Sequence, residues 1–129
     1  MNILIYGAGA IGSHIAYCMH SAGHTVYVLA RGKHFSQMKK KGLHIKIFDN
    51  QMLKDEKVII ESPRFCILSS LEQIETKMFD YIFITVKLSS YMPETIKGLK
   101  PYMAEDTAVI PPCTKLPFWW FYNFGNNLN

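Results

Sequence analysis

The chain has 129 residues, of which 49% are hydrophobic and 19% are charged, and its formal net charge is +4. This composition is typical of a globular protein and most simply predicts one domain with a buried core. The mild charge does not favour nucleic acid as a partner, and no apolar run approaches the roughly 20 residues of a membrane helix.

The cysteines and histidines indicate neither disulfides nor a metal site. Cys18, Cys66 and Cys113 are odd in number, scattered, and form no C-x-x-C pair. This spacing favours reduced thiols, as in a cytoplasmic protein. No Lys or Arg precedes Arg31, so the basic start of a signal peptide is missing. The histidines show no metal-ligand spacing, and we expect no metal site and a cytoplasmic location.

The first dozen residues form a recognisable motif. Residues 3–6 (ILIY) predict a strand, and residues 7–12 (GAGAIG) follow at once. A strand that leads through G-x-G-x-x-G into a helix is the dinucleotide-binding fingerprint. Gly7 allows the tight turn out of the strand, and Gly9 lets the pyrophosphate approach the backbone. Gly12 lets the helix pack closely on the sheet. The alternative is a glycine-rich turn without a ligand. The residues predicted to bind the cofactor here are Gly7, Ala8, Gly9, Ala10, Ile11 and Gly12.

A helix and a second strand follow, which completes a β-α-β unit. From residue 11 to 22, apolar residues recur with helical spacing and predict one buried face. Gly23 is placed to end this helix. Residues 25–30 (TVYVLA) are rich in β-forming side chains and predict a buried strand. The residues expected on the buried helix face are Ile11, Ile15, Cys18, Met19 and Ala22.

The end of the second strand bears on the choice of cofactor. Sites that prefer NAD usually carry Asp or Glu about 20 residues after the glycines, where it holds the ribose 2′-hydroxyl. Here residues 30–33 (ARGK) contain no acid. A carboxylate would repel a 2′-phosphate, whereas Arg31 can bind one through two parallel N–H···O bonds. We therefore predict NADP (NADPH) as the cofactor. The alternative is that Arg31 only lies at a strand end in water.

The remaining pattern predicts a Rossmann-like, doubly wound α/β fold with a mostly parallel sheet and a small antiparallel excursion. That excursion has strands at residues 43–48 and 58–60 around a turn at residues 49–51. Ser69 and Glu72 have capping-box spacing for a short helix. The other elements expected are helices over residues 34–41 and from Ser89 or Ser90 to Leu99, and strands at residues 65–68, 80–86 and 106–110.

Lys87 directly follows the predicted strand at residues 80–86. Ligands of open α/β sheets bind beyond the carboxyl ends of the strands. We therefore expect Lys87 to lie beside the glycine motif and Arg31; the alternative is an ordinary surface lysine. The aromatic stretch at residues 117–124 (PFWWFYNF) packs on its own domain or contacts a partner chain, for example in a homodimer. A ligand site made of these aromatic residues is the least favoured alternative.

These residues together resemble the ketopantoate reductase (2-dehydropantoate 2-reductase) family, and the resemblance covers nearly the whole chain. It implies reduction of a 2-keto acid (2-dehydropantoate) to a 2-hydroxy acid (pantoate) with NADPH, in pantothenate and coenzyme A biosynthesis. The stretches that carry it are residues 1–13 (MNILIYGAGAIGS), 22–24 (AGH), 29–32 (LARG), 85–87 (TVK) and 116–121 (LPFWWF).

The resemblance also implies two domains. Residues 1–112 correspond to the family's Rossmann-type NADP-binding domain, and residues 113–129 correspond to the start of the segment between the domains. The family's helical second domain carries the catalytic lysine and an acidic residue, and we expect it to be absent from this chain. We therefore assign no catalytic residue, and we expect the chain alone to bind the cofactor without turnover.

One position departs from the family. Its members usually carry Gln-Asn-Gly before the Trp-rich stretch, with the Asn on the nicotinamide side of the cleft. The matching residues here are Cys113-Thr114-Lys115, so Thr114 is expected to offer a hydroxyl to the cofactor in place of the amide. The substrate is therefore left open. A regulatory dinucleotide-sensing module without catalysis is the alternative function, and an interaction domain with an inactive nucleotide site is a third.

Overall fold

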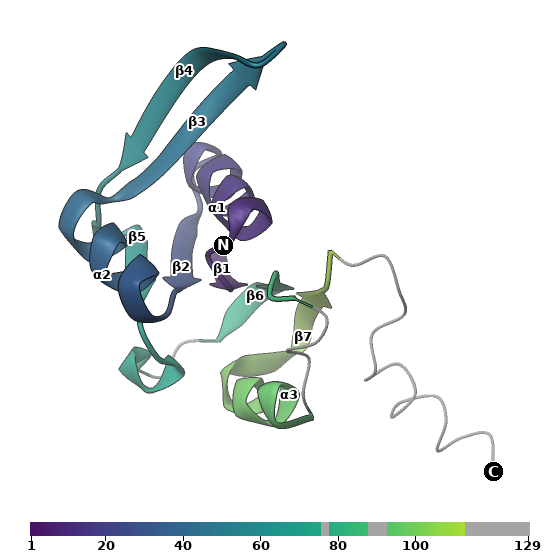
Figure 1. Cartoon of the computed structure of the whole chain (residues 1–129). Helices are drawn as coiled ribbons and strands as arrows, with labels where there is room; N and C mark the ends of the chain where they lie inside the picture. Colours follow the sequence, from purple (N-terminus) through teal and green to yellow (C-terminus); the bar gives the residue numbers. More distant parts are fainter. Residues whose placement is uncertain (76–77, 88–92, 113–129) are drawn as a thin grey trace.

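The computed structural model describes residues 1–75, 78–87 and 93–112, which form a five-stranded sheet and a separate two-stranded sheet (Figure 1). All neighbouring strands of the larger sheet are parallel, in the order β5-β2-β1-β6-β7. This topology confirms the predicted Rossmann-like, mostly parallel fold. The strands of the larger sheet are β1 (Asn2–Tyr6), β2 (Thr25–Leu29), β5 (Phe65–Leu68), β6 (Phe79–Ile84) and β7 (Met103–Ile110).

Helices cover both faces of this sheet, because successive residues of a strand point to opposite sides. Ile3 and Ile5 of β1 belong to a core cluster with Ala16 of α1 (Ala10–Ser21) and Met38 of α2 (Gly32–Lys41). Leu4 and Tyr6 belong to a second cluster with Leu99 of α3 (Pro93–Leu99). The sheet is therefore wound on both sides, which confirms the predicted doubly wound fold.

The strand register brings three carboxyl ends to one edge of the sheet. In the middle of the sheet, Tyr6 at the end of β1 pairs with Leu29 at the end of β2 on one side. On the other side it pairs with Ile84 at the end of β6. The segments that follow these three strands therefore start side by side, although they are far apart in the sequence.

The buried face of α1 differs from the prediction. Instead of the larger apolar residues, the helix buries Gly12, Ser13 and Ala16, while Ile11 is 57% exposed. Cys18 and Ala22 are exposed, and Ile15 and Met19 are partly buried. The reason is that α1 begins directly at the glycine motif and lies close to β1. Only small side chains fit between them, so the larger ones lie at the sides of the contact.

The antiparallel excursion is confirmed as a hairpin of β3 (Leu43–Asp49) and β4 (Met52–Ile59), which projects from the larger sheet (Figure 1). Its turn residues Asn50 and Gln51 have positive φ values of 47° and 66°. β4 begins six residues before the predicted strand at 58–60. Nearly all of its residues are exposed, so no apolar alternation marks the strand.

Two short 3-10 helices, η1 (Leu71–Gln73) and η3 (Lys100–Tyr102), complete the described elements. The predicted capping box at Ser69 and Glu72 is wrong by one residue. Oε1 of Gln73 accepts the backbone N–H of Ser69 at 2.7 Å and of Ser70 at 3.3 Å. The predicted helix starts at Ser89 and Ser90 lie outside the described residues. Within the described part, no helix is long and apolar enough to cross a membrane.

Candidate functional site

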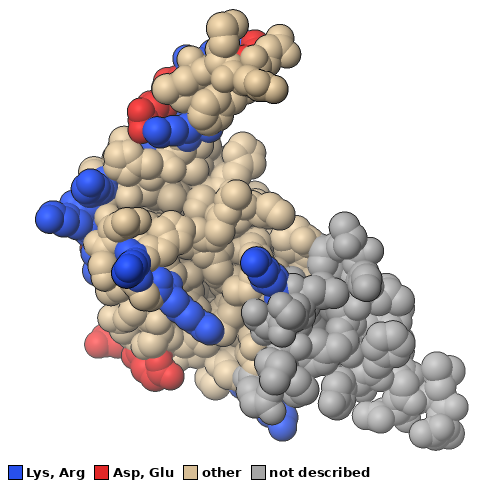
Figure 2. Space-filling model, viewed as in Figure 1, with Lys and Arg blue, Asp and Glu red and all other residues tan. Residues whose placement is uncertain are grey.

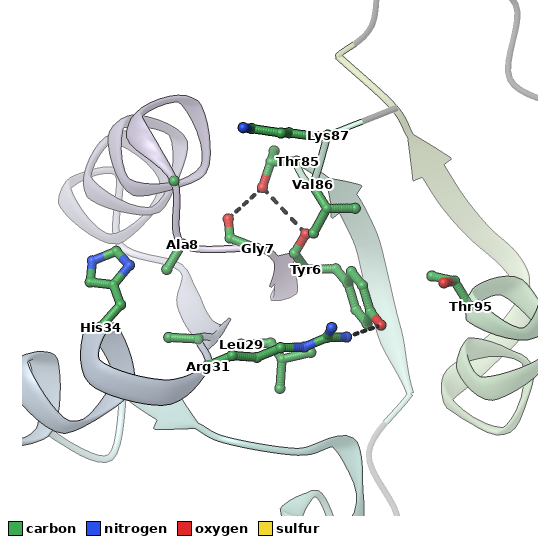
Figure 3. Close-up of a pocket in the computed structure, with 12 residues that line it drawn as sticks. Tyr6, Gly7, Ala8, Leu29, Arg31, His34, Thr85, Val86, Lys87 and Thr95 are labelled. Carbon is green, nitrogen blue, oxygen red and sulfur yellow. Dashed lines mark hydrogen bonds between the residues drawn. The ribbon is translucent and has the colours of Figure 1, made fainter. Parts of the chain in front are cut away.

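A cleft of about 670 Å³ lies at the edge where β1, β2 and β6 end (Figure 3). The loop after β1, the start of α2 and the segment after β6 line it together with Thr95 of α3. Open α/β sheets bind ligands at this edge, where the crossovers leave in opposite directions. The fold therefore places the cleft at the position where a dinucleotide site is expected.

Gly7 turns the chain out of β1 into this cleft. Its φ is +118°, a value that L side chains rarely adopt, and a Cβ added to it would lie 2.7 Å from Cγ1 of Val86. The N–H of Gly7 donates to the carbonyl of Leu29 at 3.2 Å. Both the backbone conformation and the lack of space therefore require glycine at this turn.

The other two glycines of the motif have different surroundings. A Cβ on Gly12 would collide with the carbonyl oxygen of Gly7 and the hydroxyl of Thr85. A Cβ on Gly9 would meet no atom within 4 Å, and the φ of Gly9 is −70°. The packing of the chain thus requires glycine at position 12 but not at position 9. Open space over Gly9 is what close approach of a ligand to the backbone requires.

The N-terminus of α1 is open toward this space. Gly9 is the N-cap residue, and within the described chain no side chain caps the helix and no acidic residue lies in its first turn. The N–H of Ser13 donates to the carbonyl of Gly9 at 2.8 Å and is the first hydrogen bond of the helix. The amides before it have no partner within the helix. Such amides, with the positive end of the helix dipole behind them, bind anions.

Arg31 lies in the cleft, as predicted. It is the N-cap residue of α2, two residues after the end of β2, and its side chain extends along the cleft toward Tyr6 (Figure 3). Nη2 of Arg31 donates to the hydroxyl of Tyr6 at 3.0 Å, and Cζ lies 5.9 Å from the centre of the Tyr6 ring. The guanidinium is therefore held inside the cleft by a neutral partner.

Lys87 is exposed and lines the same cleft from the β6 side (Figure 3). Among the described lining residues, Arg31 and Lys87 are cationic and none is Asp or Glu. Figure 2 shows Lys and Arg side chains from the left edge of the molecule to its middle, and acidic side chains at the lower left and on the projecting hairpin. The charge of the cleft thus suits an anionic ligand.

Thr85 joins the end of β6 to the glycine loop. Its hydroxyl donates to the carbonyl of Gly7 at 2.6 Å, and its N–H donates to the carbonyl of Tyr6 at 3.0 Å. The sequence predicts no role for the side chains of Thr85, Tyr6 or His34, which also line the cleft. Their roles depend on neighbours from other strands, and no local pattern marks them.

The predicted site residues fall into four groups. The cleft is lined by Gly7, Ala8, Gly9, Arg31 and Lys87. Ala10 lines an adjacent cavity of about 460 Å³. In α1, Ile11 is exposed and Gly12 is buried against β1, so neither lines a described cavity. Thr114 lies outside the described residues.

Comparison with known proteins identifies the family. The family described as ketopantoate reductase PanE/ApbA matches residues 3–112. The chain is 27% identical over 129 residues to the 2-dehydropantoate 2-reductase of Mesorhizobium japonicum, a match that covers 99% of the chain. The crystal structure of 2-dehydropantoate 2-reductase from Methylococcus capsulatus superposes with a TM-score of 0.65 at 25% identity over 97% of the chain.

A third similar structure is D-mandelate dehydrogenase with NADH and anilino(oxo)acetate, with a TM-score of 0.61 at 24% identity over 86% of the chain and 33% of that protein. This likeness shows the fold alone.

The chain spans 36% of the M. japonicum enzyme and 38% of the M. capsulatus enzyme. From the match over residues 3–112 and these relatives, the chain belongs to the ketopantoate reductase PanE/ApbA family of oxidoreductases.

Proposed function

We propose that the cleft binds NADPH, and that the chain is the cofactor-binding part of an enzyme that reduces 2-dehydropantoate to pantoate. One observation carries the proposal. The open N-terminus of α1 and the guanidinium of Arg31 border one cleft in which no described lining residue is acidic. That combination suits a ligand with a pyrophosphate and a second phosphate on the adenosine ribose.

Most of the predicted residues then have a defined task. The amides at Gly9, Ala10 and Ile11 hold the pyrophosphate, and Arg31 binds the 2′-phosphate. Lys87 adds positive charge beside the cofactor, and we propose that Thr114 offers a hydroxyl to it. Bound NADPH supplies the hydride that reduces a keto carbon. The chain's own residues therefore bind and orient the cofactor.

The substrate and the proton donor belong to another part of the proposed enzyme. The relatives are about three times as long as this chain, since it spans 36% and 38% of two of them. We propose that residues 1–112 form the cofactor-binding domain and that residues 113–129 begin the connection to a helical catalytic domain. On this proposal, the chain alone binds NADPH without reducing 2-dehydropantoate.

Thermal unfolding with added cofactor tests the proposal. A ligand at 100 times its Kd raises the free energy of unfolding by about 2.7 kcal/mol. At equal concentrations, we expect a larger rise in Tm with NADPH than with NADH, and a reduced NADPH effect in Arg31→Ala. Arg64→Ala is the matched control, because Arg64 is exposed and does not line the cleft.

Three outcomes would contradict the proposal. Equal shifts with NADPH and NADH would remove Arg31 as the residue that selects NADP. A shift with NADH or ATP but none with NADPH would favour a regulatory nucleotide-sensing module. Reduction of 2-dehydropantoate by the chain alone would show that the catalytic residues lie within it.

A further inference from the structure

Tyr6 and Arg31 form a pair inside the cleft (Figure 3). The hydroxyl of Tyr6 accepts a hydrogen bond of 3.0 Å from Nη2 of Arg31. Arg31 is exposed, whereas Tyr6 is only 7% exposed. A flexible, solvent-exposed cation is therefore held by a side chain that belongs to the core.

The position of the Tyr6 hydroxyl is well defined by its surroundings. The backbone of Tyr6 is paired with Leu29 on one side and with Ile84 on the other. Its ring belongs to the core cluster that also holds Leu99 of α3. Close-packed side chains of this kind keep one rotamer, so the hydroxyl presents a fixed acceptor at the edge of the cleft.

We propose that Tyr6 is a positioning residue, whose hydroxyl orients Arg31 for the 2′-phosphate of NADPH before the cofactor binds. The inference rests on the proposed function. A free arginine side chain occupies many rotamers, and binding a phosphate requires that most of them be given up. The bond to Tyr6 restricts Arg31 in advance, so less conformational entropy is lost when the phosphate arrives.

A tyrosine hydroxyl suits this task better than a carboxylate. A guanidinium has five N–H donors in a planar fork, and a single hydroxyl acceptor occupies one of them. A carboxylate would bind two donors and offset the positive charge. No described residue that lines the cleft is Asp or Glu. Arg31 therefore keeps both its charge and most of its donors for the cofactor.

Tyr6→Phe isolates the contribution of the hydroxyl. The aromatic ring remains, and with it the contact between Cζ of Arg31 and the ring at 5.9 Å, near the outer limit of a cation–π interaction. Kd values for NADPH and NADH are measured by calorimetric titration of the full 129-residue chain. We expect Tyr6→Phe to weaken NADPH binding by about three- to tenfold, the usual cost of ordering one flexible side chain on binding. NADH binding should change by less than about twofold, because NADH lacks the 2′-phosphate.

A double-mutant cycle tests whether Tyr6 acts through Arg31. In an Arg31→Ala background, Tyr6→Phe should leave the NADPH Kd unchanged. Tyr102→Phe is the matched control, because the hydroxyl of Tyr102 donates to the carbonyl of Leu71 at 2.8 Å and does not line the cleft. It removes one partly buried, hydrogen-bonded hydroxyl and should lower stability without changing the ratio of the NADPH and NADH Kd values.

The outcomes separate this inference from the proposed function. If Arg31→Ala weakens NADPH binding and Tyr6→Phe does not, the positioning role is wrong and the proposed function stands. If Tyr6→Phe tightens NADPH binding, Tyr6 holds Arg31 away from the phosphate, and the inference is overturned. If the unmodified chain does not prefer NADPH over NADH, the proposed function fails and the inference fails with it.

Discussion

Gly9 and Gly12 belong to one motif but meet different physical constraints. A Cβ at position 12 would collide with the Gly7 carbonyl and the Thr85 hydroxyl, whereas a Cβ at position 9 would meet nothing within 4 Å. If packing within the chain requires glycine, as at Gly12, its replacement should lower the free energy of unfolding. If only the ligand requires glycine, as proposed for Gly9, its replacement should weaken cofactor binding and leave the free energy of unfolding nearly unchanged. Substitution by alanine at each position can therefore separate the two roles.

Gly12→Ala is expected to lower the free energy of unfolding by about 1–3 kcal/mol, the usual cost of overpacking. Gly9→Ala is expected to change it by less than about 0.5 kcal/mol and to weaken NADPH binding, because its methyl group occupies the space of the pyrophosphate. Urea denaturation and NADPH titration measure the two effects. A Gly12→Ala variant as stable as the parent chain would contradict the close packing of α1 on β1.

The position of Arg31 could be predicted, but its partner could not. Its place in the sequence, directly after a strand, puts Arg31 at the edge of the sheet in any fold of this class. Its bond to Tyr6 joins residues 25 positions apart, and the bond from Thr85 to Gly7 joins residues 78 positions apart. Such contacts depend on strand order and register, which no local pattern encodes.

Among the larger elements, the hairpin of β3 and β4 depends on an unusual turn. Asn50 and Gln51 both have positive φ, the conformation of a type I′ turn. Asn tolerates this region, but glutamine is strained in it, and Asn-Gly is the preferred pair. Polarity predicts a turn at residues 49–51, whereas the turn consists of Asn50 and Gln51 because Asp49 still belongs to β3. Polarity alone also does not reveal the strain at Gln51.

Gln51→Gly is therefore expected to stabilise the hairpin by about 0.5–1 kcal/mol, as the strain of positive φ is removed. Hydrogen exchange of the amides in β3 and β4 measures this local stability. Gln51→Ala is the control, because alanine keeps the strained φ and should give no gain. A loss of protection in the glycine variant would show that Gln51 contributes contacts that outweigh its strain.

In the molecule as a whole, the proposed cofactor site lies at one edge of the five-stranded sheet. The hairpin projects away from that sheet (Figure 1). Ligand binding stabilises the segments it contacts and those that unfold with them. Binding of NADPH should therefore affect the two parts of the molecule differently.

Hydrogen exchange with and without NADPH can detect this difference. We expect increased protection in residues 7–13 and at the ends of β2 and β6, and little change at the hairpin tip near Asn50 and Gln51. The tip serves as an internal control within the same sample. Equal protection at the tip and in the glycine loop would indicate a site elsewhere or a general tightening of the fold.

The local features of this protein can be predicted from its residues alone: the glycine motif, most of the helices and strands, the absence of an acid after β2, and the family resemblance. These features depend on neighbouring residues or on hydrophobic periodicity, which a linear chain displays directly. The packing of α1 through Gly12, Ser13 and Ala16 and the bond between Arg31 and Tyr6 emerge only in three dimensions. The first follows from how closely α1 approaches β1, a distance that hydrophobic periodicity does not encode. The second follows from the parallel pairing of β1 with β2, which brings together residues 25 positions apart.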